Sequence, residues 1–146
     1  MTPSVPLRRK ISSIVRRKIA EQAGHRCSYC RSPEWVGIPM VMEHVIPLAV
    51  GGASDSKNLC LACYRCNEFK GARVDARDPL SGDTVPLFNP GRQAWQEHFA
   101  WSEDGVHVIG RTACGRATIA ALRLNNDWLV QARHVWVLAG LHPPLE

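Results

Sequence analysis

Two Cys-x-x-Cys pairs bracket a Glu-His dipeptide, and these residue types at this spacing could bind metal and activate water. The pairs are Cys27 with Cys30 and Cys63 with Cys66, and the dipeptide is Glu43-His44. Four thiolates on two tight turns can hold one tetrahedral zinc ion. Such a site can contribute about 10–16 kcal/mol of apparent binding energy to folding. We therefore predict a structural zinc site on these four cysteines.

Cys60 offers a different pairing, because Cys60, Cys63 and Cys66 are evenly spaced. Cys60 falls inside a predicted strand, whereas Cys63 and Cys66 straddle a turn into a predicted helix. Two cysteines can bind one metal ion where the chain turns, so we choose Cys63 and Cys66 as the second pair of zinc ligands. We expect Cys60 to be a small buried residue.

The residues inside the cysteine clamp have the chemistry of phosphodiester cleavage. That reaction needs a base to activate water and a cation to take up charge on the departing oxygen. His44 is a suitable base near neutral pH. Glu43 and Asn67 offer oxygen ligands of the kind that Mg²⁺ or Mn²⁺ prefers. Successive strand residues point to opposite faces, so Glu43 and His44 can share a site only if the strand ends there.

The elements that must position these residues form a strand, loop, strand, helix pattern. Apolar and β-branched residues predict strands at 36–43 and 58–62, and a short helix follows at 64–70. An amphipathic helix with many basic residues is predicted at 8–23. The C-terminal part predicts a connecting segment at 78–90 and then a hairpin and two helices. The hairpin covers 98–101 and 106–111, and the helices cover about 114–124 and 127–140.

These elements predict an α+β fold in a single domain. We expect residues 1–146 to form one domain, because 146 residues suit a modest core. Residues 8–78 would hold the N-terminal helix and a small zinc-stabilised core. Residues 79–146 would add an accessory hairpin and two helices.

Composition and charge limit the class of protein. The hydrophobic fraction of 45% is typical of a globular chain. No apolar run reaches the roughly 18 residues that a membrane span needs, and no secretory signal is evident, so a cytoplasmic location without a membrane is expected. Residues 1–75 hold 12 Lys/Arg against 6 Asp/Glu, while the rest hold 6 against 7. A polyanionic partner explains this asymmetry, and solubility alone explains it equally well.

The combined motif resembles the HNH endonuclease family with its ββα-metal fold, over about residues 25–72. The matching sequence is Glu43-His44-x-x-Pro47, Gly51-Gly52, Asn58-Leu59 and Cys63-x-x-Cys66-Asn67-x-x-Lys70-Gly71. The resemblance implies that His44 is the general base and that Glu43 and Asn67 bind the catalytic ion. It implies that Asn58 braces the loop that holds the base, which places it among the catalytic residues. It also implies the structural zinc on the four cysteines.

Two positions depart from the common family pattern. The acidic position is often Asp, and Glu43 is one methylene longer, which affects the distance to the metal. The last position is Asn67 where the family has His or Asn. An amide oxygen suits Mg²⁺ or Mn²⁺ better than it suits a catalytic zinc ion.

The leading hypothesis is a metal-dependent endonuclease that hydrolyses DNA, with RNA as a further candidate substrate. Arg65, Lys70 and Arg73 are candidate phosphate contacts, and a solvated helix face explains them equally well. The alternative is a non-catalytic, zinc-dependent nucleic-acid-binding module. A third hypothesis is an interaction protein that docks through its tryptophan-rich C-terminal helices. The target, the mode of cutting, the pathway and the oligomeric state do not follow from the sequence.

Overall fold

The computed structural model of the chain describes residues 11–145, and its first helix packs against the central hairpin. Helix α1 spans Ser13–Gln22, and the hydroxyl of Ser12 caps it by accepting from the Val15 N–H. Ile19 and Ala20 pack against Leu59 and Leu61. The predicted helix at 8–23 is therefore present in its described part, whereas Arg8, Arg9 and Lys10 lie outside the described residues.

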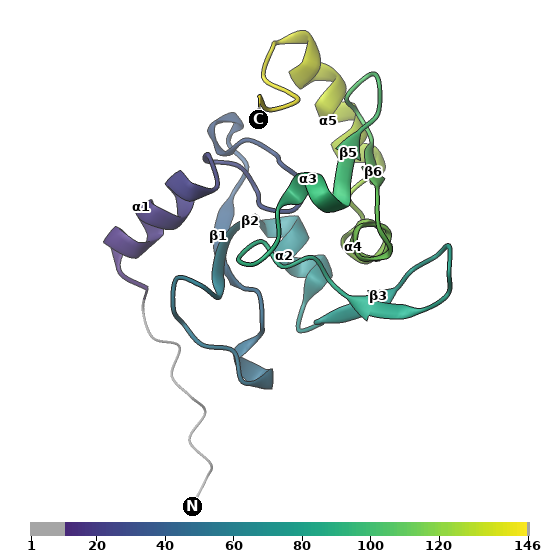
Figure 1. Cartoon of the computed structure of the whole chain (residues 1–146). Helices are drawn as coiled ribbons and strands as arrows, with labels where there is room; N and C mark the ends of the chain where they lie inside the picture. The colour runs from purple at the N-terminus through teal and green to yellow at the C-terminus, as the bar shows by residue number, and fades with distance from the viewer. Residues whose placement is uncertain (1–10, 146) are drawn as a thin grey trace, which may run out of the picture.

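A β-hairpin followed by a short helix forms the centre of the molecule (Figure 1). Strand β1 (Met40–His44) pairs antiparallel with β2 (Leu59–Cys63), and His44 lies opposite Leu59. Helix α2 (Tyr64–Lys70) follows β2 directly, with the bounds that the sequence predicts. This ββα arrangement confirms the predicted core.

The first predicted strand begins too early. Residues Glu34–Val36 form the 3₁₀ turn η1, and Gly37 ends it with a φ of 87°. This left-handed conformation favours glycine and turns the chain before the strand. Strand β1 therefore begins only at Met40, after Pro39.

The C-terminal part contains the predicted hairpin and two helices. The hairpin consists of β5 (Phe99–Trp101) and β6 (Val108–Gly110). Helices α4 (Ala113–Leu122) and α5 (Asp127–Leu138) follow. The mixed α/β class with small antiparallel sheets is thus confirmed.

A second hairpin was not predicted, because its sequence contains several turn-forming residues. Strand β3 (Asp75–Arg77) pairs with β4 (Thr84–Pro86), and Pro86 lies at the strand end opposite Asp75. The short helix α3 (Trp95–His98) then leads into β5. A proline is tolerated at such an edge, which explains why the prediction of a simple connecting segment was wrong.

The cysteine-rich core and the C-terminal part share one hydrophobic cluster. Phe88, Trp95, Phe99, Leu122 and Leu124 are buried together with the four paired cysteines. The indole N–H of Trp95 donates to the Tyr29 carbonyl at 3.0 Å, inside the turn between the first two cysteines. The accessory elements therefore pack directly against the cysteine turns.

Helix α5 buries Trp136 and leaves its other tryptophan on the surface. Trp128 is 74% exposed and Val135 is also exposed, whereas Arg133 is fully buried. The Arg133 guanidinium donates to the carbonyls of Val106 and Leu124. These hydrogen bonds compensate for the burial of the Arg133 guanidinium, as does its stacking over Trp101 at 5.1 Å from the ring centroid. Among residues 11–145, no helix is long and apolar enough to cross a membrane.

Candidate active site and metal centre

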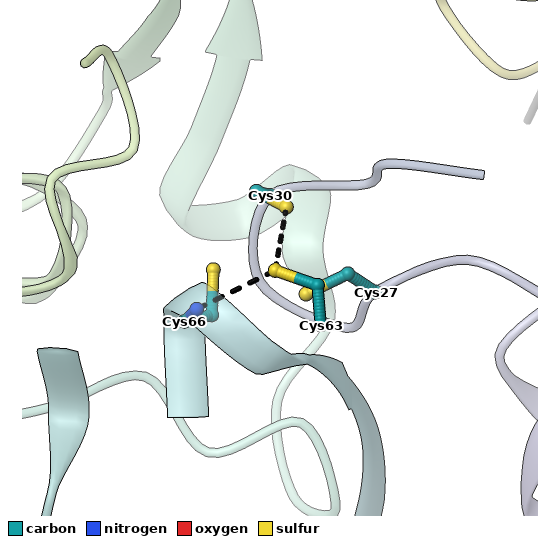
Figure 2. Close-up of side chains that lie close together, drawn as sticks. All are labelled: Cys27, Cys30, Cys63 and Cys66. Carbon is teal, nitrogen blue, oxygen red and sulfur yellow. Dashed lines mark hydrogen bonds between the residues drawn. The ribbon is translucent and has the colours of Figure 1, made fainter. Parts of the chain in front are cut away.

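The four predicted zinc ligands converge in the structure. The sulfur atoms of Cys27, Cys30, Cys63 and Cys66 all lie within 4.8 Å of one another, and all four residues are buried. Figure 2 shows the two turns bringing them together, with 3.7 Å between the sulfurs of Cys30 and Cys63. A tetrahedral zinc ion with Zn–S bonds of about 2.3 Å needs sulfurs about 3.8 Å apart. The donor set therefore fits a structural zinc ion.

Local hydrogen bonds shape the two cysteine turns. In the first turn the Cys27 N–H donates to the Ser32 carbonyl, and the Arg31 N–H donates to the Cys27 carbonyl. In the second, the Cys63 sulfur caps α2 by accepting from the Cys66 N–H at 3.4 Å (Figure 2). The second turn is thus the beginning of a helix.

Cys60 lies outside this cluster, as expected. Cys60 and Cys63 are three residues apart on β2, so their side chains point to opposite faces. The Cys60 sulfur lies 3.3 Å from Glu43 Oε2. Cys114 is also outside the cluster and is partly buried.

The thiols of the cluster influence one another strongly. Burial is the main cause that raises the pKa of Cys27. Hydrogen bonds from the other three thiols, that of Cys27 above all, lower the pKa of Cys30. The neighbouring thiols thus favour the thiolate form of Cys30. Several buried thiolates together need a soft cation such as zinc.

Three of the predicted catalytic and metal-binding residues line one cavity of about 240 Å³. They are Glu43, His44 and Asn67, and the remaining wall is made by Pro47, Leu48, Ala49 and Gly71. Strand β1 ends at His44, and the loop with the 3₁₀ turn η2 (Leu48–Val50) follows it. The end of the strand is what allows two consecutive residues to border one cavity. Helix α2 contributes Asn67 from the other side.

The imidazole ring of His44 contacts a serine of the loop that follows β1. Its Nε2 atom lies 3.0 Å from the Ser54 hydroxyl oxygen, and the residue is half-buried. A half-buried imidazole at a cavity wall can exchange protons with water there. Ser54 was not predicted as a site residue, since nothing in the sequence distinguishes it from other loop serines.

Asn58 connects the two ends of the same loop. Its Oδ1 accepts from the Ile46 N–H at 2.9 Å. Its Nδ2 donates to the carbonyls of Ile46 and Ala53 at 2.9 and 2.8 Å. An added Cβ on Gly52 would lie 1.7 Å from the Ile46 carbonyl oxygen, so only glycine fits beside this contact. The loop after His44 is therefore pinned by Asn58 and packed on Gly52.

Glu43 is buried at the back of the cavity and is engaged by three side chains. Tyr29 donates its hydroxyl to Oε2 at 2.6 Å, and Cys60 lies beside the same oxygen. The Lys70 ammonium lies 2.6 Å from Oε1. Burial is the main cause that raises the pKa values of Tyr29 and Cys60, so both remain protonated donors at neutral pH. Tyr29 was not predicted as a site residue, although its position between Cys27 and Cys30 could have indicated that it lies near the site.

This arrangement corrects one prediction. Lys70 was a candidate phosphate contact, but its side chain is only 1% exposed and its ammonium faces Glu43. It also donates to the Val45 carbonyl at 2.8 Å. A buried ammonium with these partners is not available to a phosphate on the surface.

The other two candidate phosphate contacts are exposed, and they differ in their surroundings. Arg65 lies on the surface of α2. Arg73 has its guanidinium on the carbonyls of Phe69 and Ala121, and so it links α2 to α4. Three exposed bases on α1 (Arg16, Arg17 and Lys18) add positive charge to the described surface.

The cavity also has the donor chemistry for a hard divalent ion. Glu43 Oε1 is buried beside the Lys70 ammonium and accepts no hydrogen bond from residues 11–145, so it retains lone pairs toward a second cation. Asn67 brings an amide oxygen to the same cavity. Carboxylate, amide and water oxygens are what Mg²⁺ and Mn²⁺ prefer. The residues present therefore fit such an ion.

Comparison with protein families agrees with the resemblance seen in the sequence. Residues 27–78 match the family model described as HNH endonuclease. No match was found among curated proteins or among solved structures. The matched segment contains the cysteine cluster, β1, β2, α2 and the cavity. It supports a nuclease-type function on nucleic acid.

Proposed function

We propose, from the HNH endonuclease family domain at residues 27–78, that the protein is a metal-dependent endonuclease that hydrolyses DNA. The observation that carries this proposal is the shared cavity of His44, Glu43 and Asn67 inside the family match. The four-cysteine cluster would hold a structural zinc ion that fixes the two turns around it.

His44 acts as the general base in this proposal. It takes the proton from a water molecule that attacks the phosphorus in line with the leaving 3′ oxygen. Asn58 and Ser54 hold the loop and the imidazole in place for that step. The family resemblance implies products with a 5′-phosphate and a 3′-hydroxyl.

Glu43 and Asn67 would hold the catalytic Mg²⁺ or Mn²⁺ ion. When bound, such an ion stabilises negative charge on the transferring phosphate and on the leaving oxygen. The protein supplies the fixed carboxylate and amide that orient this charge relative to His44.

Plasmid cleavage with a His44→Ala variant tests the proposal. Wild type should cut DNA with Mg²⁺ or Mn²⁺ and stop when EDTA removes the ion, and the variant should lose about 10²- to 10⁴-fold in rate. His134→Ala removes an exposed imidazole on α5 and serves as the matched control. Zinc content and far-UV circular dichroism verify that each variant is folded.

The outcome separates the proposal from its alternatives. Equal cleavage by wild type and His44→Ala would contradict a role for this histidine. Salt-sensitive DNA binding without cleavage, unaffected by His44→Ala, would indicate the non-catalytic binding module instead. Parallel reactions with single-stranded DNA, double-stranded DNA and RNA identify the substrate.

A further inference from the structure

A single buried ammonium connects three consecutive residues of the proposed active site. The Lys70 Nζ atom lies 2.6 Å from Glu43 Oε1 and 2.8 Å from the Val45 carbonyl oxygen. A third and longer contact of 3.5 Å reaches the carbonyl of His44 itself. The ammonium faces one carboxylate, with which it forms an ion pair, and two backbone carbonyls that accept from it. Lys70, at the end of α2, thus fixes the end of β1 in place.

The carboxylate of Glu43 is fixed on its other side as well. Tyr29 donates to Oε2 at 2.6 Å from the turn between the first two cysteines. The exposed fraction is 3% for the Glu43 side chain and 1% for that of Lys70. The pair is therefore poorly screened by solvent and salt, and its charges act on each other at close range.

The charge of the cavity follows from this pair. Glu43 is the only acidic side chain among the described residues that line the cavity. The Lys70 ammonium compensates it at ion-pair distance. The wall that meets a divalent ion therefore carries close to zero net charge, although it contains a carboxylate.

A hard divalent ion gains little attraction from a carboxylate that is already neutralised. Mg²⁺ typically binds through one or two carboxylates together with substrate phosphates. In this cavity the missing negative charge can come from the phosphate of a nucleic acid. We infer that Lys70 is a positioning residue whose charge makes binding of the catalytic ion depend on bound DNA. This inference rests on the proposed function.

Titration of Mn²⁺ into the protein with and without DNA tests this coupling. A His44→Ala background keeps a short duplex intact, and protein-free duplex is titrated in parallel because phosphates bind Mn²⁺ by themselves. The Mn²⁺ affinity should be about tenfold higher, or more, when the duplex is bound. Because coupling is reciprocal, Mn²⁺ should strengthen duplex binding by the same factor.

Lys70→Met identifies the source of the coupling. Without the ammonium, Glu43 should bind Mn²⁺ about fivefold or more tightly in the absence of DNA, and the coupling should shrink. Cleavage at saturating Mn²⁺ should fall, since the end of β1 loses its donor. Lys70→Arg should retain wild-type Mn²⁺ affinity, and Lys57→Met, which removes an exposed positive charge outside the cavity, should have no effect on it.

The sign of the change distinguishes this role from a merely structural one. A residue that only supports the fold would weaken Mn²⁺ binding when it is replaced. The inference is overturned if zinc-loaded Lys70→Met binds Mn²⁺ no more tightly than wild type. If this variant does not fold, Lys70→Gln, which also removes the charge but keeps a hydrogen-bond donor, is measured against the same criterion.

Cleavage by wild type separates this inference from the proposed function. If wild type cuts DNA but the Mn²⁺ affinity is the same with and without duplex, the coupling is wrong and the nuclease assignment stands. If wild type neither cuts DNA nor binds Mn²⁺ under any of these conditions, both are wrong.

Discussion

The cysteine cluster and the cavity at His44 are two candidate metal sites on the same short helix, and they differ in burial and in ligand chemistry. Cys63 and Cys66 at the start of α2 belong to the cluster, and Asn67 one residue later belongs to the cavity. The cluster is buried and its ligands are four cysteine thiols. The cavity is bordered by a loop, and its only acidic side chain within the described chain already has a cation beside it.

This difference separates an ion that holds the fold from an ion that takes part in a reaction. A closed set of four thiolates leaves no position for a substrate, so its zinc ion stabilises structure. An open cavity with oxygen donors suits an ion that exchanges with solvent and meets a phosphate. We therefore expect disruption of the cluster to abolish folding and disruption of the cavity to abolish cleavage alone.

The largest effect is expected from Cys66→Ser. Loss of one thiolate should remove zinc and with it about 10 kcal/mol or more of apparent binding energy, which is comparable to the whole stability of a typical domain. The variant should contain no zinc and show an unfolded circular dichroism spectrum. Cys114→Ser, outside the cluster, should keep both zinc and fold. A folded, zinc-free Cys66→Ser protein would contradict a structural role for the cluster.

Gly52→Ala should affect the cavity and spare the cluster. The new Cβ cannot coexist with the Ile46 carbonyl at 1.7 Å, so the loop that carries Ser54 must move. A displacement of about 1 Å in an active site can cost about 10²-fold in rate, and we expect a loss of this order with zinc content unchanged. Ser56→Ala in the same loop is the matched control. Simultaneous loss of zinc would show that the two places are not independent.

Acid should weaken the contact between Asp78, at the end of the segment that matches the family model, and α4 only at low pH. Hydrogen bonds from Arg116 are the main cause that holds the pKa of Asp78 well below its usual range. The ion pair therefore stabilises the fold above the unfolded-state pKa of about 3.9, and this contribution is lost as pH falls toward the lower folded-state value. Asp78→Asn should lower the melting temperature by a similar amount at pH 7 and pH 5.

The same pH series compares the acid sensitivity of the Asp78–Arg116 ion pair with that of the cysteine cluster. Zinc release, followed with a colorimetric chelator, should begin at a higher pH than loss of the Asp78 contribution, because thiolates bind protons more readily than this carboxylate. If the melting-temperature difference between wild type and Asp78→Asn disappears already between pH 7 and pH 5, the assigned pKa direction is wrong.

The smallest effect is expected from Ser54→Ala. It removes one hydrogen bond to the His44 ring and leaves the other elements of the cavity in place. A single hydrogen bond of about 0.5–1.5 kcal/mol corresponds to a rate loss of roughly two- to tenfold. Initial cleavage rates at saturating Mn²⁺ measure it, with zinc content as the control for folding. An unchanged rate would mean that Ser54 does not orient the base.

The sequence predicted the elements whose signals are local. Helix α2 was predicted with its observed bounds, because Cys63 starts it and Gly71 ends it with a φ of 54°. The choice of Cys63 and Cys66 over Cys60 was confirmed, since alternation along β2 separates them. The β3–β4 hairpin was missed, because Pro79, Gly82 and Pro86 are typical of loops as well as of hairpins.

Properties that depend on distant partners could not be predicted. Lys70 and Glu43 are far apart in sequence, and only the folded chain shows that one neutralises the other. In α5, Trp128 is exposed and Arg133 is buried, and the sequence could not predict this because helical spacing does not identify which face finds hydrogen-bonding carbonyls. The roles of His44, Glu43, Asn58 and Asn67 in catalysis remain predictions that the experiments above test.

The register of β1 against β2 determines which side chains face the interior at the end of β1. His44 is paired with Leu59 and Glu43 with Cys60. A slip of the pairing by one residue would turn every side chain of β1 to the opposite face. The imidazole would then face the interior, and the carboxylate would face the more exposed side. Lys70, by contacting Glu43 and Val45 at once, makes that exchange costly and so keeps Glu43 buried and His44 half-buried.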